Sequence, residues 1–423
     1  MPTVLYKWDF ETGDTQGWML EGYVSLDSTS AIQGTYSLYT DGSRTGRIEA
    51  GSSKRVAYIQ NIDLSTANRP LLAFLVRVAT PGGYANYSGI RVVVKDSAGN
   101  TLLDRVLAIR RGTSYDVTKA VSVDLSPVAS MTGLTIEIYW YAYGGNIDGH
   151  SACKLYVDNI HIIDGGDREY NIALLALSNS DRTLTFSIPD ADRALPSGVA
   201  MFAINLATPP HPLAEDTDIF TYTVACDQGS ASITSTDANN RHASPITAPS
   251  LPPAYIDTLS IRSHVTSVGF DYYAFDETVV VTFWSSSWGL LAVYVFRVAI
   301  TINPYSPTYA TAMINTTYGS AWAGQREFTA KVHARSLGIR CYVRYLVGDN
   351  TIVQAGTVKL EVFSEDYSVK YGESSVDLTT GTVLRGPVIA GLPVDTTLML
   401  RISWSITAST RVVIEVRPEF LVY

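Results

Sequence analysis

The chain has 423 residues, of which 17% are charged, and its formal net charge at pH 7 is −9. The basic residues form no stripe of the kind that neutralises phosphates, so nucleic acid is excluded as an expected partner. The longest apolar stretch, residues 289–302, is interrupted by Arg297 and is too short to cross a bilayer, so no membrane span is expected either.

Short runs of β-branched and aromatic residues recur along the chain, separated by Gly, Asn, Asp, Pro or Ser. In chain order, clear examples are Arg91–Lys95, Leu134–Trp140, Thr278–Trp284 and Val412–Val416. Runs of this length, bounded by turn residues, are typical of sandwiches and jelly rolls. No long segment has apolar residues at helical spacing. The sequence therefore predicts an all-β fold made of tandem β-sandwich or jelly-roll domains.

Two breaks divide these runs into three predicted domains. The strand-like run that ends at Ile163 is followed by Asp164–Asp167, a short glycine-containing linker, and a second break falls near Pro304–Pro307. The predicted domains are residues 1–165, a jelly roll; residues 166–305, a β-sandwich with a long polar loop near 230–253; and residues 306–423, a further β-sandwich.

The start of the chain carries no targeting signal. Met1 leads into the first strand-like run without a basic or an apolar leader segment, although the composition, rich in Tyr, Ser and Thr, is typical of proteins that work outside a cell. A virion protein satisfies both observations, because it leaves the cell on an assembled particle. A secreted protein whose leader has been removed is the alternative.

Segments of the amino-terminal domain carry the most specific signal. Trp8–Glu11 and Thr12–Trp18 open the domain, Ala31–Tyr39 follows, and Leu155–Ile160 closes it. In this order they resemble the jelly-roll carbohydrate-binding module superfamily, with its F-E…G-W start, S…G-x-x-S-L second strand and V-D-N-[VI] last strand. The resemblance covers residues 3–163 and implies a jelly roll. It is less specific for sugar binding, because this jelly roll also occurs in virion and surface proteins.

The first and last strands of a jelly roll lie together, so Asp9, Glu11 and Asp158 are expected to meet. Carboxylates that converge with turn carbonyls form a hard oxygen site suited to Ca²⁺. A structural calcium commonly sits there in the superfamily, so the resemblance implies Glu11 and Asp158 as ligands, with carbonyls near Gly34 and Tyr36. The alternative is that Asp158 caps its turn and Glu11 is only solvated.

Aromatic side chains are the candidates for sugar contact, because such modules stack rings on pyranose faces and fix orientation with polar groups. Strand alternation places Tyr139, Tyr141 and Tyr143 on one face and Trp140 on the other, and one of these faces has to be core. The predicted ligand-binding residues are Tyr139, Trp140, Tyr141, Tyr143, Tyr58, Tyr84 and Tyr87. The alternative is that most of them are core or interface aromatics.

No catalytic residue is predicted. Glycoside hydrolysis needs two carboxylates on a rigid cleft, whereas the adjacent acids of this chain fall in turn-like polar contexts where acids are usually solvated. These acids are Glu215 with Asp216 and Asp218, Asp276 with Glu277, and Glu365 with Asp366. The histidines and cysteines have no metal-ligand spacing, and Cys153, Cys226 and Cys341 are predicted to be small buried hydrophobes.

Three hypotheses about function follow. The first is a non-enzymatic structural or adhesive protein of a virus particle surface, such as a spike, turret, fibre or decoration. It would assemble as a homo-oligomer, contact other virion proteins and bind a host glycan. The alternative is a secreted or cell-surface protein, outside the cell, that binds carbohydrate or forms filaments. The third is a polysaccharide-active enzyme.

Overall fold

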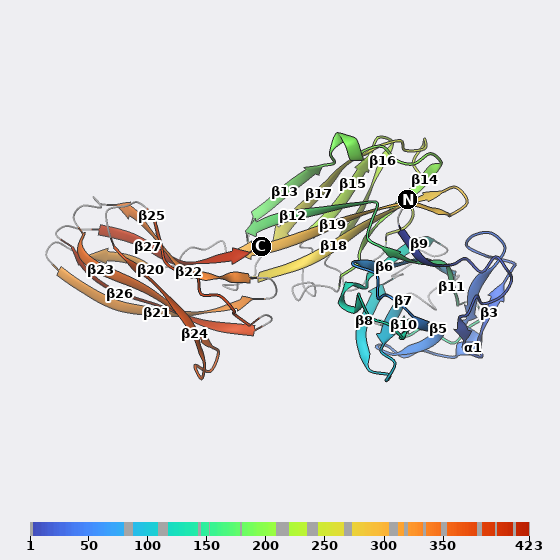
Figure 1. Ribbon diagram of the computed structural model, residues 1–423, viewed down its shortest axis with the longest axis horizontal. Helices are drawn as coiled ribbons and strands as arrows, with labels where there is room; N and C mark the ends of the chain where they lie inside the picture. The colour runs from blue at the N-terminus through green and yellow to red at the C-terminus, as the bar shows by residue number, and fades with distance from the viewer. Residues whose placement is uncertain are drawn as a thin grey trace. The chain divides into compact units, whose positions relative to one another are not determined.

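The computed structural model describes residues 3–79, 88–108, 117–142, 145–151, 153–177, 180–208, 220–234, 244–265, 273–303, 312–316, 320–332, 336–347, 353–378, 383–393, 396–408 and 412–422. In these residues strands predominate and form six sheets (Figure 1). The predicted all-β class with tandem sandwiches is therefore confirmed. No helix in the described ranges is long and apolar enough to span a membrane.

Sheets 1 and 2 form the amino-terminal sandwich. Sheet 1 has the order β3 (Val24–Asp27), β4 (Ser37–Asp41), β11 (Lys154–Asp164), β6 (Pro70–Ala79) and β9 (Thr118–Asp124), and β1 (Thr3–Trp8) also pairs with β11. Sheet 2 has the order β2 (Met19–Leu20), β5 (Ser53–Ile62), β10 (Leu134–Ala142), β7 (Ser88–Lys95) and β8 (Thr101–Ala108). A single helical turn, α1 (Gly42–Thr45), and a 3-10 turn, η2 (Ser126–Val128), complete it. The pairing of first and last strands is the arrangement that the resemblance implied.

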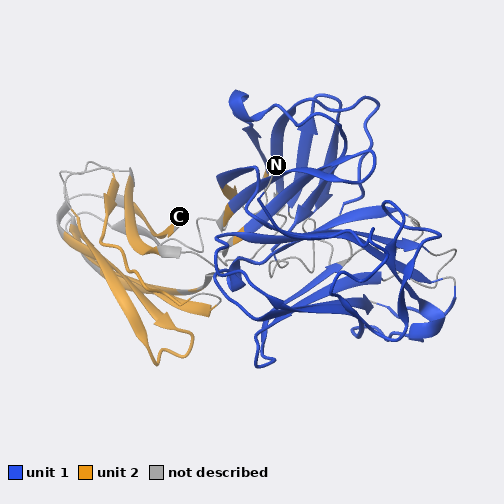
Figure 2. Ribbon diagram, turned by 45° about the vertical axis from the view of Figure 1, so that its right-hand side comes forward, with its two compact units in different colours: residues 1–172, 182–263, 277–298 blue, residues 173–181, 264–276, 299–423 orange. Residues whose placement is uncertain are grey.

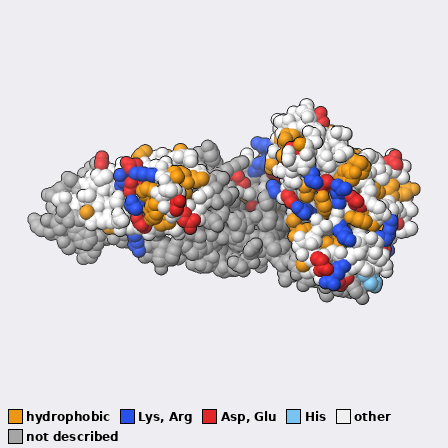
Figure 3. Space-filling model, turned by 90° about the horizontal axis from the view of Figure 1, so that it is seen from below, with side chains coloured by type: hydrophobic (Ala, Val, Ile, Leu, Met, Phe, Trp, Pro, Cys, Tyr) orange, Lys and Arg blue, Asp and Glu red, His pale blue; other side chains and the backbone are white. Residues whose placement is uncertain are grey.

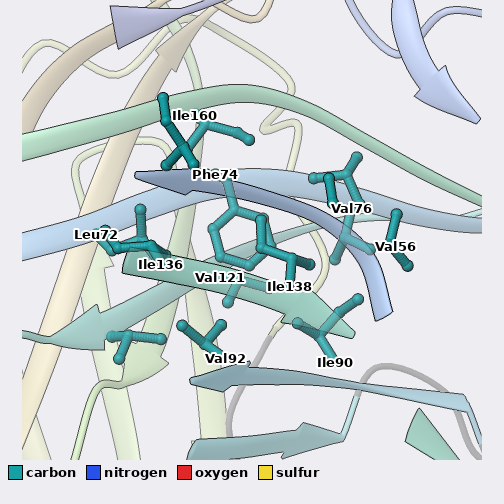
Figure 4. Close-up of a cluster of buried hydrophobic side chains, with 14 of the residues drawn as sticks. Val56, Leu72, Phe74, Val76, Ile90, Val92, Val121, Ile136, Ile138 and Ile160 are labelled. Atoms are coloured by element: carbon teal, nitrogen blue, oxygen red, sulfur yellow. The ribbon is translucent and has the colours of Figure 1, made fainter. Parts of the chain in front are cut away.

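The core of this sandwich lies between the two sheets, because alternate residues of each strand point inward. Figure 4 shows part of it, with Val56, Leu72, Phe74, Val76, Ile90, Val92, Val121, Ile136, Ile138 and Ile160, all buried. Truncating the fully buried Phe74 to Ala is expected to cost about 3–5 kcal/mol, because the cavity cannot collapse completely.

Sheets 3 and 4 are built from the middle of the chain. Sheet 3 has the order β12 (Arg168–Leu177), β19 (Leu290–Asn303), β18 (Tyr273–Ser285) and β14 (Val199–Leu206). Sheet 4 has the order β13 (Ser180–Ser187), β17 (Ile256–Val265), β15 (Phe220–Cys226) and β16 (Gly229–Thr234), and a 3-10 turn, η3 (Asp190–Asp192), precedes β14.

Sheets 5 and 6 form the carboxy-terminal sandwich. Sheet 5 has the order β20 (Ala312–Thr316), β27 (Val412–Val422), β22 (Ser336–Val347) and β25 (Val383–Arg385). Sheet 6 has the order β21 (Ser320–Val332), β26 (Thr396–Ala408), β23 (Val353–Ser364) and β24 (Lys370–Asp377). Their shared core again comes from alternate residues, such as Ile339, Cys341 and Val343 of β22.

The chain divides into two compact units (Figure 2). Unit 1 comprises residues 1–172, 182–263 and 277–298, and unit 2 comprises residues 173–181, 264–276 and 299–423. The three pairs of sheets are drawn from residues 3–164, 168–303 and 312–422. The predicted domain boundaries near 165 and 305 stay predictions.

Within unit 1, the outer face of sheet 1 is buried against sheet 3, along a surface that we call the seam. Sheet 1 contributes the buried side chains Leu71, Leu75, Ala120, Tyr156 and Ile163. Sheet 3 contributes Ala203, Val280, Trp284, Val293 and Val295, together with Ala207, which directly follows β14. Because the seam covers the outer face of sheet 1, the outer face of sheet 2 is the sheet surface of the jelly roll that stays available to a ligand.

Polar contacts fix how sheet 1 and sheet 3 are positioned on each other along the seam. Asn159 Nδ2 donates to the carbonyl oxygen of Trp288 at 2.7 Å, and the Asp124 amide donates to the carbonyl oxygen of Ala207 at 3.1 Å. Arg297 lies between two carboxylates, 3.6 Å from Asp124 and 3.7 Å from Glu169. Directional contacts of this kind hold two apolar faces in one relative position.

The predicted polar loop near 230–253 differs from the structure at both of its described ends. Residues 229–234 form β16, because Ala231 and Ile233 alternate into the core and the backbone pairs with β15. Farther on, Ile246 packs against the seam, and the Thr247 amide donates to the carbonyl oxygen of Phe202 at 2.9 Å. Residues 235–243 lie outside the described residues.

All three cysteines are buried, as predicted. Burial raises the pKa of the Cys226 and Cys341 thiols to about 12. A thiol with so high a pKa carries almost no thiolate at neutral pH, so neither residue is suited to nucleophilic chemistry.

Candidate functional site on the outer face of sheet 2

Strand β10 divides its side chains between the core and the surface. Ile136, Ile138 and Trp140 point into the sandwich and are fully buried. Tyr139 and Tyr141 alternate with them and are half-buried on the outer face of sheet 2. Alternation is therefore the local reason that aromatic rings line this face.

Neighbouring strands bring further side chains to the same face. Opposite Tyr139 lie Arg55 of β5 on one side and Arg91 of β7 on the other. The next outward residue of β10, Glu137, lies opposite Tyr58 of β5. The outer face of sheet 2 is thus a two-dimensional array of tyrosines and charged groups. Figure 3, which views the molecule from below Figure 1, shows hydrophobic, basic and acidic side chains interspersed on this side of the jelly roll.

Glu137 is the centre of a hydrogen-bond network. Its side chain is 4% exposed, and its carboxylate accepts from Arg55 Nη1 at 2.9 Å, from Lys95 Nζ at 2.7 Å and from the Tyr139 hydroxyl at 2.7 Å. Burial works to raise the pKa of Glu137, but these three donors outweigh it and hold the pKa below its usual value. Glu137 is therefore a buried carboxylate that is ionised at neutral pH.

The remaining charges on the face are also paired. Arg55 Nε donates to Glu21 at 2.6 Å, and Arg91 makes a two-pronged contact with Asp104, at 2.8 Å through Nε and 2.5 Å through Nη2. Two planar hydrogen bonds to one carboxylate fix the plane of a guanidinium. These pairs hold Arg55 and Arg91 rigidly on the face.

Two of the tyrosine rings are covered on one side by a cation. The Arg55 guanidinium lies 4.3 Å from the centre of the Tyr58 ring, and that of Arg91 lies 5.7 Å from the centre of the Tyr139 ring. Among the described residues, no cation lies over the ring of Tyr141. Burial and the Glu137 carboxylate raise the pKa of Tyr139 to about 12, so its hydroxyl stays a donor at neutral pH.

The predicted aromatic residues have different outcomes. Tyr58, Tyr139 and Tyr141 lie together on the outer face. Trp140 is a correction: its side chain is fully buried and its indole N–H donates to Ser88 Oγ at 3.2 Å, so its ring cannot reach a ligand. Tyr84, Tyr87 and Tyr143 lie outside the described residues.

The sequence prediction missed the charged half of the site. Arg55, Arg91, Lys95 and Glu137 were not identified. A signal for Glu137 was present, because it is the one charged residue in the run Leu134–Trp140. A lone charge in a strand of apolar and aromatic residues indicates a side chain that needs partners on the same face.

The predicted calcium ligands surround the loop 33–37. The Glu11 carboxylate accepts from the amides of Thr35, at 2.8 and 2.9 Å, and Tyr36, at 3.1 Å. Asp158 accepts from the Gln33 amide at 2.9 Å and from Ser37 Oγ at 2.7 Å. Burial, together with the nearby Glu11 charge, raises the pKa of Asp158 to about 7.

Asp9 does not join Glu11 and Asp158. It pairs instead with Lys7 at 2.9 Å and accepts from Gln16 Nε2 at 3.0 Å, and the described residues contain no group of three or more His, Cys, Asp or Glu side chains placed to hold a metal. Gly34 packs directly on Glu11, since a Cβ atom there would lie 2.3 Å from the carboxylate carbon. One further feature bears on a cation held by Glu11 and Asp158. The side-chain oxygen of Gln33, Oε1, is buried and accepts no hydrogen bond from the described residues. The Gln33 backbone amide donates to Asp158, and a side-chain amide oxygen is among the ligand types that Ca²⁺ accepts.

The acidic pairs examined for catalysis have structural surroundings where they are described. Glu277 is buried, with its carboxylate against the Tyr222 hydroxyl, and burial raises its pKa to about 8. The Asp366 carboxylate accepts from Ser364 Oγ and Ser368 Oγ within its turn, which lowers its pKa to about 2. Glu215, Asp216 and Asp218 lie outside the described residues.

Comparison with known proteins gives similarity only to solved structures. No family model and no curated protein matches the chain. The xylan-binding domain CBM22-1 from Paenibacillus barcinonensis is 19% identical over 38% of this chain and 94% of that chain, with a TM-score of 0.25. The carboxy-terminal family 22 module of a Clostridium thermocellum protein is 14% identical over 38% of this chain and 92% of that chain, with a TM-score of 0.26. TmCBM61, in complex with β-1,4-galactotriose, is 17% identical over 37% of this chain and 94% of that chain, with a TM-score of 0.25.

Carbohydrate-binding modules are thus among the solved structures to which this chain is similar. Similarity at such low identity and TM-score identifies neither a ligand nor a virus particle.

Proposed function

We propose that the chain is a non-enzymatic glycan-binding protein and that the outer face of sheet 2 is its binding surface. The observation that supports this most strongly is the placement of Tyr58, Tyr139 and Tyr141 on one rigid sheet face around the buried Glu137 carboxylate. Aromatic rings offer stacking surfaces to sugar rings, and a fixed polar network orients the sugar hydroxyls.

The charge balance of this face favours a neutral glycan. The cations are Arg55, Arg91 and Lys95, and the carboxylates are Glu21, Glu137 and Asp104, so the three positive and three negative charges cancel. Because each cation is paired, an anionic ligand would have to displace an existing partner. A neutral sugar needs only the donors and acceptors that these pairs leave free.

A panel of neutral polysaccharides tests the proposal, with binding to the full chain measured by titration calorimetry. Tyr139→Ala and Tyr141→Ala are expected to weaken binding by roughly tenfold each, equal to about 1.4 kcal/mol. Tyr255→Ala is the matched control, because Tyr255 is 52% exposed and bridges to Ala194 directly before β17 of sheet 4, outside sheet 2. Failure of the unaltered chain to bind any neutral glycan, or equal losses in the control, would contradict the proposal.

The finer proposal is that this protein is a homo-oligomeric component of a virus particle surface, as a spike, turret, fibre or decoration. It is supported by the low share of charged residues, 17%, and by the succession of sandwiches. The alternative is a secreted or cell-surface glycan-binding protein or filament subunit. Imaging the protein in its native material distinguishes these two proposals. If the protein is found only as a free monomer and never on particles, the virus-particle proposal is wrong and the alternative remains.

We also propose a structural Ca²⁺ held by Glu11 and Asp158, with Gln33 Oε1 as a further oxygen. The ion would neutralise two carboxylates that hold the same loop. The absence of catalysis is part of the functional proposal. Glycan-cleaving activity that disappears in Glu215→Gln or Asp276→Asn would overturn it.

A further inference from the structure

The outer face of sheet 5 in the carboxy-terminal sandwich, whose strands β22, β25 and β27 are labelled in Figure 1, is rich in arginine. Strand β22 places Ile339, Cys341 and Val343 in the core, so the residues between them and after them point outward. The charged side chains that this alternation and the strand register bring to the outer face are Arg340, Arg344, Arg385, Arg417, Glu415 and Glu419. Four positive and two negative charges leave a formal charge of +2 on one face of a chain whose net charge is −9.

One carboxylate serves two of these arginines. Glu419 accepts from Arg340 Nε at 2.5 Å and from Arg385 Nε at 3.1 Å. Within the described part of the chain, the terminal amino groups of both guanidiniums have no hydrogen-bond acceptor. Each arginine is therefore held in place by its Nε while its outer donors stay available.

The other two arginines are less neutralised. Arg417 is exposed and, among the described residues, pairs with no carboxylate. Its guanidinium lies 4.4 Å from the centre of the Tyr342 ring, and Arg385 lies 5.5 Å from the same ring. The side chain of Arg344 is 52% exposed, and its closest carboxylate oxygen, Glu415 Oε2, is 4.0 Å away. Stacking on the Tyr342 ring orders Arg417 without consuming its in-plane donors.

We propose that the outer face of sheet 5 is a second binding site, which takes the carboxylate or sulfate groups of an anionic polysaccharide. A guanidinium presents paired donors that match either group in a two-pronged contact. Arg340 and Arg344 are four residues apart on one strand, so their Cα atoms are separated by roughly 13 Å. A polymer with repeated charges reaches arginines at such a spacing, whereas a single small anion does not.

This site is distinct from the outer face of sheet 2 in position and in charge, and it does not depend on the function proposed there. On the outer face of sheet 2, Arg55, Arg91 and Lys95 each have a carboxylate partner and the charges cancel. On sheet 5 the arginines exceed the carboxylates by two. Two carboxylates among four arginines also disfavour nucleic acid, because its closely spaced phosphates would meet Glu415 and Glu419.

Titration calorimetry on the full chain tests the proposal with polygalacturonate as the carboxylate polymer, dextran sulfate as the sulfate polymer, unmodified dextran as the neutral polymer and polyuridylate as the polynucleotide. We expect the chain to bind one or both anionic glycans, more weakly as salt increases, and to bind them at least tenfold less tightly in the double variant Arg344→Gln/Arg417→Gln. Whichever anionic glycan binds identifies the charged group.

The matched control is Lys359→Gln/Lys370→Gln, which removes two positive charges from sheet 6 of the same sandwich. This control variant should bind the anionic glycan with an affinity within twofold of that of the unaltered chain, because a local site depends on the position of the charges and not on their total. Arg417→Lys should weaken binding as well, since lysine keeps the charge but loses the paired donors. Binding of neither anionic glycan, equal losses in the control, or tighter binding of polyuridylate would overturn the proposal.

Discussion

Glu137 and Tyr139 lie two residues apart on β10, and the Tyr139 hydroxyl donates to the Glu137 carboxylate at 2.7 Å. The same carboxylate holds Arg55 and Lys95, so one buried acid orders an aromatic ring and two cations on the outer face of sheet 2. The shape of the proposed glycan surface therefore depends on the charge of a residue that is itself almost inaccessible to ligand.

Glu137→Gln should lower the free energy of unfolding at pH 7 by roughly 3 kcal/mol, because it leaves Lys95 without its carboxylate and Arg55 with Glu21 alone. The folded pKa of Glu137 is lowered, so its stabilising effect is complete above the unfolded pKa of about 4.3 and is lost as pH falls through the folded value. The difference between the two proteins should therefore shrink in acid. Urea unfolding at pH 7 and at pH 3 measures it.

Glu49→Gln provides the comparison for this variant. Glu49 is 63% exposed and pairs with Arg47 at 3.1 Å, a surface contact that contributes about 0.5 kcal/mol or less. If both variants lose equally little stability, Glu137 is not the centre of the network.

The strands and fold class could be predicted from the sequence, whereas the burial of particular faces could not. Period-two alternation is local, so Tyr139 and Tyr141 were correctly separated from Trp140. Which side faces the core depends on partners far away in the chain, such as Ser88, which accepts the hydrogen bond from Trp140.

The seam illustrates the same limit. Strand β6 is apolar on both faces, and a continuous apolar run indicates a strand covered on both sides. That signal predicts that something covers sheet 1 without identifying sheet 3 as the cover. Trp284 and Leu75 share one buried cluster although they come from different sheets and lie far apart in the chain.

A fragment of residues 1–165 should therefore self-associate more strongly than the full chain. It exposes the outer face of sheet 1, including the apolar side chains of Leu71, Leu75 and Tyr156, which are buried in the full chain. Exposed apolar side chains of this kind promote association. We expect the fragment to bind a hydrophobic dye and to self-associate, as measured by dye fluorescence and by light scattering after size exclusion. A monomeric fragment that binds no dye would show that the seam is dispensable.

His161 should make stability sensitive to mild acid. Burial lowers its pKa to about 4, although the Asn159 carbonyl accepts from its ring. The unfolded state, with a pKa of about 6.5, therefore binds a proton that the folded state excludes between pH 6.5 and pH 4. Across that window the contribution of His161 to the free energy of unfolding should fall by an amount on the order of 3 kcal/mol.

His161→Gln should remove this part of the pH dependence, as measured by urea unfolding at pH 7 and at pH 4.5. The exposed His150 provides the control: His150→Gln should keep the full slope. An unchanged slope in His161→Gln would show that the imidazole is not buried in the neutral form.

Chelation tests the proposed calcium. If Glu11 and Asp158 hold Ca²⁺, the ion binds the folded state alone and stabilises it by mass action, by about 2.7 kcal/mol at a hundredfold excess over the dissociation constant. Addition of a chelator should then lower the melting midpoint of the unaltered chain, and added Ca²⁺ should restore it.

Glu11→Gln should have a lower midpoint that no longer responds to either reagent. Asp9→Asn should keep the response, because Asp9 pairs with Lys7 and Gln16 and not with the loop at 33–37. A midpoint of the unaltered chain that ignores the chelator would leave Glu11 and Asp158 as hydrogen-bond acceptors for that loop, with no ion between them.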